Sequence, residues 1–177
     1  KNYELKIQSS EIMEEALAEI LSSNLPYTTN KLDIYNSGLI GVDSLSSHIN
    51  TKSGNKYSKI ATTNPEFAAL FVELFSQIDS SLVNTVSPDT IAVSYTGSFP
   101  GANVALLSAC KALNIHPVII SSIGSSEWGA NNIDMTWIDI ENHLNNTIFE
   151  NRSAAVSLGG DNDTAEELTD SIKNVLT

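Results

Sequence analysis

Two of five predicted helices carry apolar residues at three- and four-residue spacing, which places these residues on one face of a helix. One of them begins at Asn64 and Pro65, a pair typical of a helix start. Asparagine can accept hydrogen bonds from free amides there, and proline at the first helical position sacrifices no hydrogen bond. The predicted helices are residues 10–22, 64–78, 102–113, 134–146 and 165–175.

Short apolar runs between these helices predict buried strands at residues 39–42, 91–95, 118–123 and 154–158, with a further short strand around 56–61. Strands that alternate with helices favour a parallel sheet, because each right-handed crossover lays its helix against the sheet. We therefore expect one α/β domain over residues 1–177. Its predicted form is a three-layer, Rossmann-like, mostly parallel sheet of about four to five strands with helices on both faces.

The chain is strongly acidic: nine Lys and Arg against 21 Asp and Glu give a formal net charge of -12. This balance argues against nucleic acid as a partner, because neutralising phosphates requires a basic face. The single cysteine, Cys110, excludes a disulfide within the chain and a multi-cysteine zinc site. No apolar run approaches the roughly 18 residues of a membrane-spanning helix.

Ligands of parallel sheets bind beyond the carboxyl ends of the strands, so the loops at 43–63, 96–101, 124–132 and 159–163 are the candidate site. No Asp or Glu occurs between Ser44 and Pro65, or between Thr90 and Ser126. The first of these stretches carries three lysines. Two interpretations stay open: an anion site, or a solvated lysine-bearing loop beside buried strands. The lysines are Lys52, Lys56 and Lys59.

The loop at 96–101 follows a strand and opens a helix, where backbone amides and short hydroxyl side chains can hold an anion. It lacks the Gly-Lys-Ser/Thr end of a Walker loop and the three glycines of a dinucleotide fingerprint, so we expect no cofactor. Substrate binding, a structural turn and a nucleophilic serine are all compatible with it. The candidate binding residues are Thr96, Gly97, Ser98, Phe99 and Gly101, with Lys59, Ser125, Ser126 and Trp128 from the neighbouring loops.

If Ser98 is a nucleophile, it needs a base. His48 follows the first predicted strand and is the best-placed histidine, with Asp161 or Asp163 to orient it. His116 falls at the opposite edge of the sheet and His143 within a helix. An alternative is that His48 is a solvated loop residue.

Two further features have competing interpretations. Asp161 and Asp163, with Asp43 and Glu127, could supply oxygen ligands to Mg²⁺ or Ca²⁺. The same Gly-Gly-Asp-Asn-Asp-Thr segment is equally typical of a turn and an acidic helix start, so we assign no metal. Trp128, an aromatic residue in a polar loop, either lines a pocket or fastens the loop to the core.

Several blocks, in order from about residue 10 to the end, resemble the poly-γ-glutamate system protein family. They are residues 38–42 (GLIGV), 63–70 (TNPEFAAL), 97–100 (GSFP), 119–124 (IISSIG), 128–130 (WGA), 136–139 (TWID) and 157–161 (SLGGD). Two departures matter, because Glu127 replaces an expected small or polar residue and His48 is not typical of the family. The second departure weakens the histidine-based triad.

The resemblance implies an accessory component of bacterial poly-γ-glutamate capsule synthesis or export. It implies a membrane anchor upstream of residue 1, a location at the outer face of the cytoplasmic membrane, and the synthase and export components as partners. An acid-free crevice near Lys52, Lys56 and Lys59 would hold a chain end or another small anionic ligand, because a broad acidic surface would repel the polymer. Two alternatives are a serine-dependent γ-glutamyl hydrolase or transferase and a phosphate or nucleotide sensor. Whether the protein is an enzyme is left open by these residues.

Overall fold

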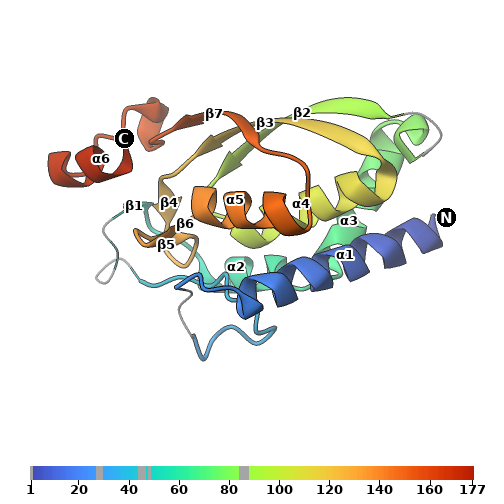
Figure 1. Ribbon diagram of the computed structural model, residues 1–177, viewed down its shortest axis with the longest axis horizontal. Helices are drawn as coiled ribbons and strands as arrows, with labels where there is room; N and C mark the ends of the chain where they lie inside the picture. Colours follow the sequence, from blue (N-terminus) through green and yellow to red (C-terminus); the bar gives the residue numbers. More distant parts are fainter. Residues whose placement is uncertain (1, 27–29, 44–46, 48, 84–87) are drawn as a thin grey trace.

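The computed structural model describes residues 2–26, 30–43, 47, 49–83 and 88–177. The protein is α/β, and its main sheet contains three parallel strands in the order β2 (Asp89–Thr96), β3 (Ile115–Ser122) and β7 (Ser153–Ser157). These strands confirm the predicted strands at 91–95, 118–123 and 154–158. The chain termini lie at opposite ends of the molecule (Figure 1).

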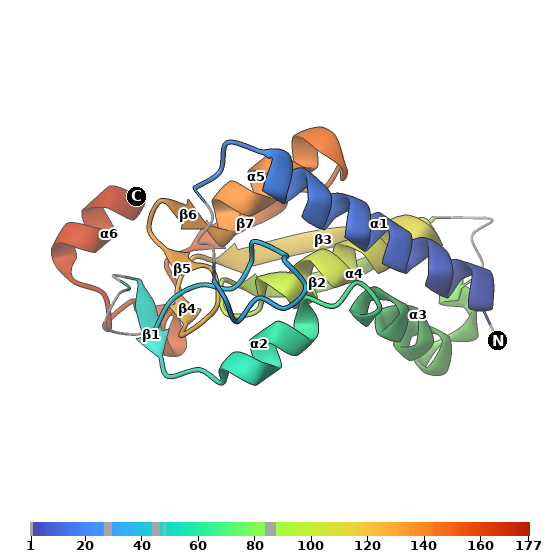
Figure 2. The same ribbon diagram turned by 90° about the horizontal axis from the view of Figure 1, so that it is seen from below.

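The helices form two layers on one side of this sheet (Figures 1 and 2). The first layer contains α4 (Pro100–Leu113) and α5 (Trp137–Thr147), and the second contains α1 (Tyr3–Ser22) and α3 (Phe67–Ile78). Apolar side chains from the helices and strands form the core between them, including Met13, Ile20, Leu107, Ile119 and Trp137.

The opposite face of the sheet is exposed among the described residues. Along β3, Ile119 is 0% exposed, whereas its neighbours Val118 and Ile120 are 46% and 54% exposed. This alternation follows from the two-residue period of a strand, with only one face packed on helices. The expected sheet of four to five strands with helices on both faces is therefore not confirmed.

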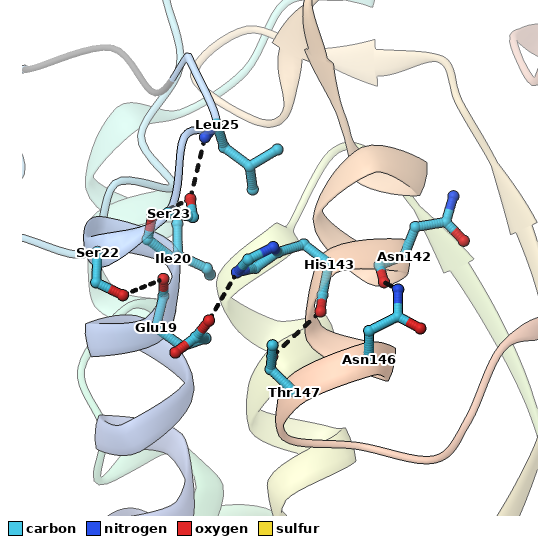
Figure 3. Close-up of polar contacts among 9 residues, drawn as sticks. All are labelled: Glu19, Ile20, Ser22, Ser23, Leu25, Asn142, His143, Asn146 and Thr147. Atoms are coloured by element: carbon cyan, nitrogen blue, oxygen red, sulfur yellow. Dashed lines mark hydrogen bonds and ion pairs between the residues drawn. The ribbon is translucent and has the colours of Figure 1, made fainter.

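Two polar contacts fix α5 in place. The buried Glu141 carboxylate accepts hydrogen bonds from the backbone N–H of Ser153 (3.1 Å) and from its hydroxyl (2.7 Å), which ties α5 to the start of β7. On the other side of the helix, His143 Nε2 lies 3.1 Å from Glu19 Oε1 of α1 (Figure 3). The prediction that His143 lies within a helix is confirmed.

Two predicted strands are wrong. Residues 39–42 are irregular, because their polar groups bond to one loop: Trp128 N–H donates to Val42 O at 3.0 Å, and Asn131 Nδ2 donates to the same oxygen at 2.7 Å. Residues 56–61 lie in helix α2 (Lys56–Thr62), whose start is capped by the Asn55 side chain, which accepts from the Ser58 N–H at 3.1 Å.

The predicted helices are present with shifted ends. Helix α1 begins at Tyr3 instead of near residue 10, and the last helix, α6 (Asp170–Leu176), is shorter than residues 165–175. The remaining elements are the strands β1 (Asn50–Lys52), β4 (Ser125–Ser126), β5 (Asn131–Asn132) and β6 (Met135–Thr136), and the 3₁₀ helices η1 (Ser80–Val83) and η2 (Asp161–Asp163). Strand β1 pairs in parallel with β4, and β5 pairs antiparallel with β6.

Within the part of the chain that the structure describes, no helix combines the length and apolar character needed to cross a membrane.

Candidate functional site

The candidate site lies where the three parallel strands end. Thr96 at the end of β2 is paired with Ser122 of β3, which is paired with Ser157 of β7. The loops at 97–99, 123–130 and 158–163 therefore leave the same edge of the sheet, as the sequence predicted for a parallel arrangement. Helix α2 packs against α4 beside this edge and brings Lys59 to it.

Lys59 is a buried lysine, only 2% exposed, on the inner side of α2. Its Nζ donates to the hydroxyl of Ser126 at 2.7 Å and to the backbone carbonyl of Ser98. The same nitrogen lies 3.4 Å from the centroid of the Phe99 ring. Burial penalises the charged amine and lowers its pKa from 10.5 to about 8.

Ser98 and Ser126 come from different loops and are joined directly. The backbone N–H of Ser126 donates to Ser98 Oγ at 3.0 Å, and the N–H of Ser98 donates to Thr96 Oγ1 at 3.1 Å. Both serines are partly exposed. The structure thus brings together the hydroxyls of two partly exposed serines and one buried amine, and it is the Ser126 hydroxyl that contacts the amine.

Helix α4 begins at this cluster. No side chain caps its start, and Pro100 occupies its first turn. The first amides of a helix have no acceptor within the helix, so the N–H groups of Gly101 and Ala102 lie at the positive end of the helix dipole. A Cβ at Gly101 would lie 2.6 Å from Thr62 O, so this glycine allows α4 to approach α2 closely.

The other loop residues that the sequence suggested have mainly packing contacts. Ser125 is 0% exposed, and its hydroxyl donates to Gly97 O at 3.0 Å. A Cβ at Gly129 would lie 2.6 Å from Gly97 O and 2.7 Å from Ser98 O. These close approaches hold the loops after β2 and β3 against each other.

Trp128 is partly exposed at the rim of the cluster and has a left-handed backbone, with φ of 66°. This conformation is strained for a bulky residue. It is held by hydrogen bonds on both sides, since Trp128 N–H donates to Val42 O and Gly41 N–H donates to Trp128 O. Lys56 Nζ lies 6.0 Å from the Trp128 ring centroid, so a cation and an aromatic face lie together on the rim.

Asp161 and Asp163, which the sequence suggested as partners of His48 or as metal ligands, contact other groups. His48 lies outside the described residues. Asp161 forms an ion pair with Lys52, and Asp163 Oδ1 accepts from the Ser157 hydroxyl at 2.6 Å and from the Gly159 N–H at 3.1 Å. Across the described ranges, no three His, Cys, Asp or Glu side chains are grouped to hold a metal ion.

The sequence suggested Lys59 and Ser126 as candidate binding residues but did not predict their contact with each other. Interpreting residues 56–61 as a strand hid it. The useful signal was Asn55, because a helix capped there places Lys59 and Thr62, three residues apart, on one buried face.

Comparisons of the chain with protein-family models, with curated proteins and with solved structures found no match.

Proposed function

We propose that this cluster is an acyl-transfer site in which Ser126 is the nucleophile and Lys59 is the general base. The observation that carries the proposal is the 2.7 Å contact between Lys59 Nζ and Ser126 Oγ. A base must be unprotonated, and a pKa of about 8 leaves roughly a tenth of the lysine neutral at pH 7. Neutral Lys59 can keep one N–H on Ser98 O while its lone pair accepts the Ser126 proton.

The reaction follows from these roles. Ser126 Oγ forms a bond to the carbonyl carbon of an amide, and its proton passes to Lys59 Nζ. The charge that develops on the carbonyl oxygen is stabilised by N–H groups at the start of α4. The C–N bond then breaks as Lys59 returns the proton to the leaving amine. Water or a second amine attacks the acyl-Ser126, which gives hydrolysis or transfer, respectively.

Ser98 has a supporting role in this proposal. Its hydroxyl accepts from the Ser126 N–H at 3.0 Å, which fixes the backbone of the nucleophile, and its carbonyl anchors Lys59. The sequence suggested Ser98 itself as the nucleophile. We favour Ser126, because the contact of Lys59 with Ser98 is to the backbone carbonyl.

For the substrate, we propose a γ-glutamyl chain. This rests on the resemblance to the poly-γ-glutamate system proteins and on the lysines at the site. Lys56 beside Trp128 offers a cation and an aromatic surface at the rim, which suits a chain end that carries carboxylates. The domain would then trim, release or transfer the polymer during capsule synthesis or export, next to the membrane components that make it.

A second candidate function is capture of the acidic chain without chemistry. Lys59 already donates to two protein acceptors, Ser98 O and Ser126 Oγ. These contacts favour a structural role in which Lys59 holds the two loops together and takes no part in a reaction. In that case Lys56 and the start of α4 would bind the polymer.

The deciding experiment incubates the purified domain with poly-γ-glutamate of defined length and follows chain length and free amine. We expect the polymer to shorten or be transferred, and the rate to rise with pH as Lys59 loses its proton near pH 8. Ser126→Ala and Lys59→Met should each lower the rate by about 100-fold or more. Ser94→Ala is the matched control, since Ser94 is an exposed serine of β2 with no part in the cluster.

The outcomes separate the candidates. If Ser98→Ala loses activity and Ser126→Ala keeps full activity, Ser98 is the nucleophile and our assignment of Ser126 is wrong. Polymer that stays intact with the wild-type domain would overturn the enzymatic proposal. Binding would then be measured by titrating the same polymer, and equal affinity of the Lys56→Met variant would count against the capture site.

A further inference from the structure

A second surface, apart from the strand-end cluster, lies between α1 and the start of α3. The two helices lie side by side in both views (Figures 1 and 2). A groove of about 640 Å³ runs between them. Its lining includes Tyr3, Ile7, Glu11 and Glu14 of α1, and Glu66 and Ala69 at the start of α3.

The groove has an apolar strip that faces solvent. Tyr3 is 70% exposed and Ile7 is 41% exposed, and they are four residues apart on one face of α1. Ala69 of α3 lies opposite them in the lining. Large apolar side chains grouped at the surface in this way are typical of a binding groove.

The charge of the groove is negative. Glu11, Glu14 and Glu66 are exposed and line it. Among the described lining residues the one lysine, Lys6, is already paired, because its Nζ lies 2.6 Å from Glu73 Oε2. An apolar strip bordered by carboxylates is complementary to a segment that carries apolar residues flanked by Lys or Arg.

We propose that this groove docks a basic amphipathic helix of a protein partner. Tyr3 to Glu14 spans eleven helical steps, about 16 Å, so three turns of a partner helix can lie along α1. The apolar stripe of that helix packs on Tyr3, Ile7 and Ala69, and its basic residues face Glu11, Glu14 and Glu66. A second copy of this chain fits poorly, because two acidic grooves of a protein with a net charge of -12 would repel each other.

The test uses a synthetic amphipathic helical peptide of leucine and lysine, about 15 residues long, and a peptide of the same composition in shuffled order. Fluorescence anisotropy measures the affinity of each for the whole chain. We expect the amphipathic peptide to bind and the shuffled peptide to bind about tenfold more weakly, because only the first presents one apolar face. Ile7→Ser should weaken binding about fivefold, whereas Ile78→Ser, at a residue 76% exposed elsewhere, should not.

The charge contribution is tested with two variants of equal net charge. Glu11→Gln/Glu14→Gln should weaken peptide binding about fivefold. Glu15→Gln/Glu150→Gln removes two exposed carboxylates outside the groove, and it should change the affinity for the peptide by less than about twofold. Equal weakening by both pairs, or equal affinity of both peptides, would show nonspecific attraction to an acidic protein and overturn the proposal. Self-association of the chain that Ile7→Ser abolishes would assign the groove to a second copy and also overturn it.

Discussion

At the scale of a single residue, the surroundings of Lys59 change the pKa of its amine. The side chain is 2% exposed, and its amine contacts a carbonyl, a hydroxyl and the face of an aromatic ring. Each contact favours the charged amine, but loss of hydration opposes it and lowers the pKa to about 8. A group that changes charge near neutral pH is suited to proton transfer.

This pKa predicts a pH dependence of stability. Between pH 8 and 10.5 the folded state loses the Lys59 proton while the unfolded state keeps it, so the unfolded state binds more protons and the free energy of unfolding rises with pH. Between pH 8 and 10.5 the free energy of unfolding of the wild-type protein should rise by roughly 1 to 3 kcal/mol more than that of Lys59→Met. Urea unfolding at several pH values measures the difference. A difference that stays flat would mean that Lys59 keeps its ordinary pKa.

At the scale of elements, strand β3 has two unlike faces. Ile119 is fully buried against the helices, whereas Ile120, the next residue, is 54% exposed. The alternation in β3 was not visible in the sequence, because the run at 118–123 is apolar on both faces, as in a strand buried on both sides. Helix α5 was more predictable, since Thr136 and Asp139 form a capping box with spacing that can be read directly.

The two isoleucines should therefore differ in their contribution to stability. Ile119→Ala leaves a cavity in the core and should lower the free energy of unfolding by about 2 to 4 kcal/mol. Ile120→Ala removes a half-exposed side chain and should lower it by less than about 1 kcal/mol. Thermal or urea unfolding of both variants measures this. Equal losses would mean that another segment or partner covers the exposed face.

At the scale of the whole molecule, the main electrostatic feature is the net charge of -12. The two Lys–carboxylate ion pairs between described residues, Lys6–Glu73 and Lys52–Asp161, involve partly exposed side chains, and such pairs stabilise a fold only slightly. Repulsion among the remaining carboxylates acts against the compact state. The acidic groove between α1 and α3 is one local result of this imbalance.

Screening this repulsion should stabilise the protein. Raising NaCl from about 20 to 300 mM shortens the Debye length severalfold, and the melting temperature should rise by about 2 to 5 °C. Differential scanning fluorimetry in NaCl and in KCl measures the change and excludes a sodium-specific effect. A melting temperature that falls with salt would show that attractive ion pairs outweigh the repulsion.

The sequence by itself determined the three strands of the main sheet, the helices α4 and α5 between them, and the loops that leave their ends. The apolar spacing located the strands β2, β3 and β7, and parallel topology then required the loops after them to leave one edge of the sheet. Local information was sufficient for this, because helix and strand periods are visible within about ten residues.

Only the tertiary structure decided how the site is assembled. Lys59 and Ser126 are separated by 67 positions in the chain, and no local pattern encodes the distance between their side chains. The packing of α2 against α4 decides it, with Gly101 allowing the close approach. Tertiary packing also decided which face of the sheet is exposed. The three strand sequences are compatible with burial on both faces, but the helices of both layers lie on one side of the sheet.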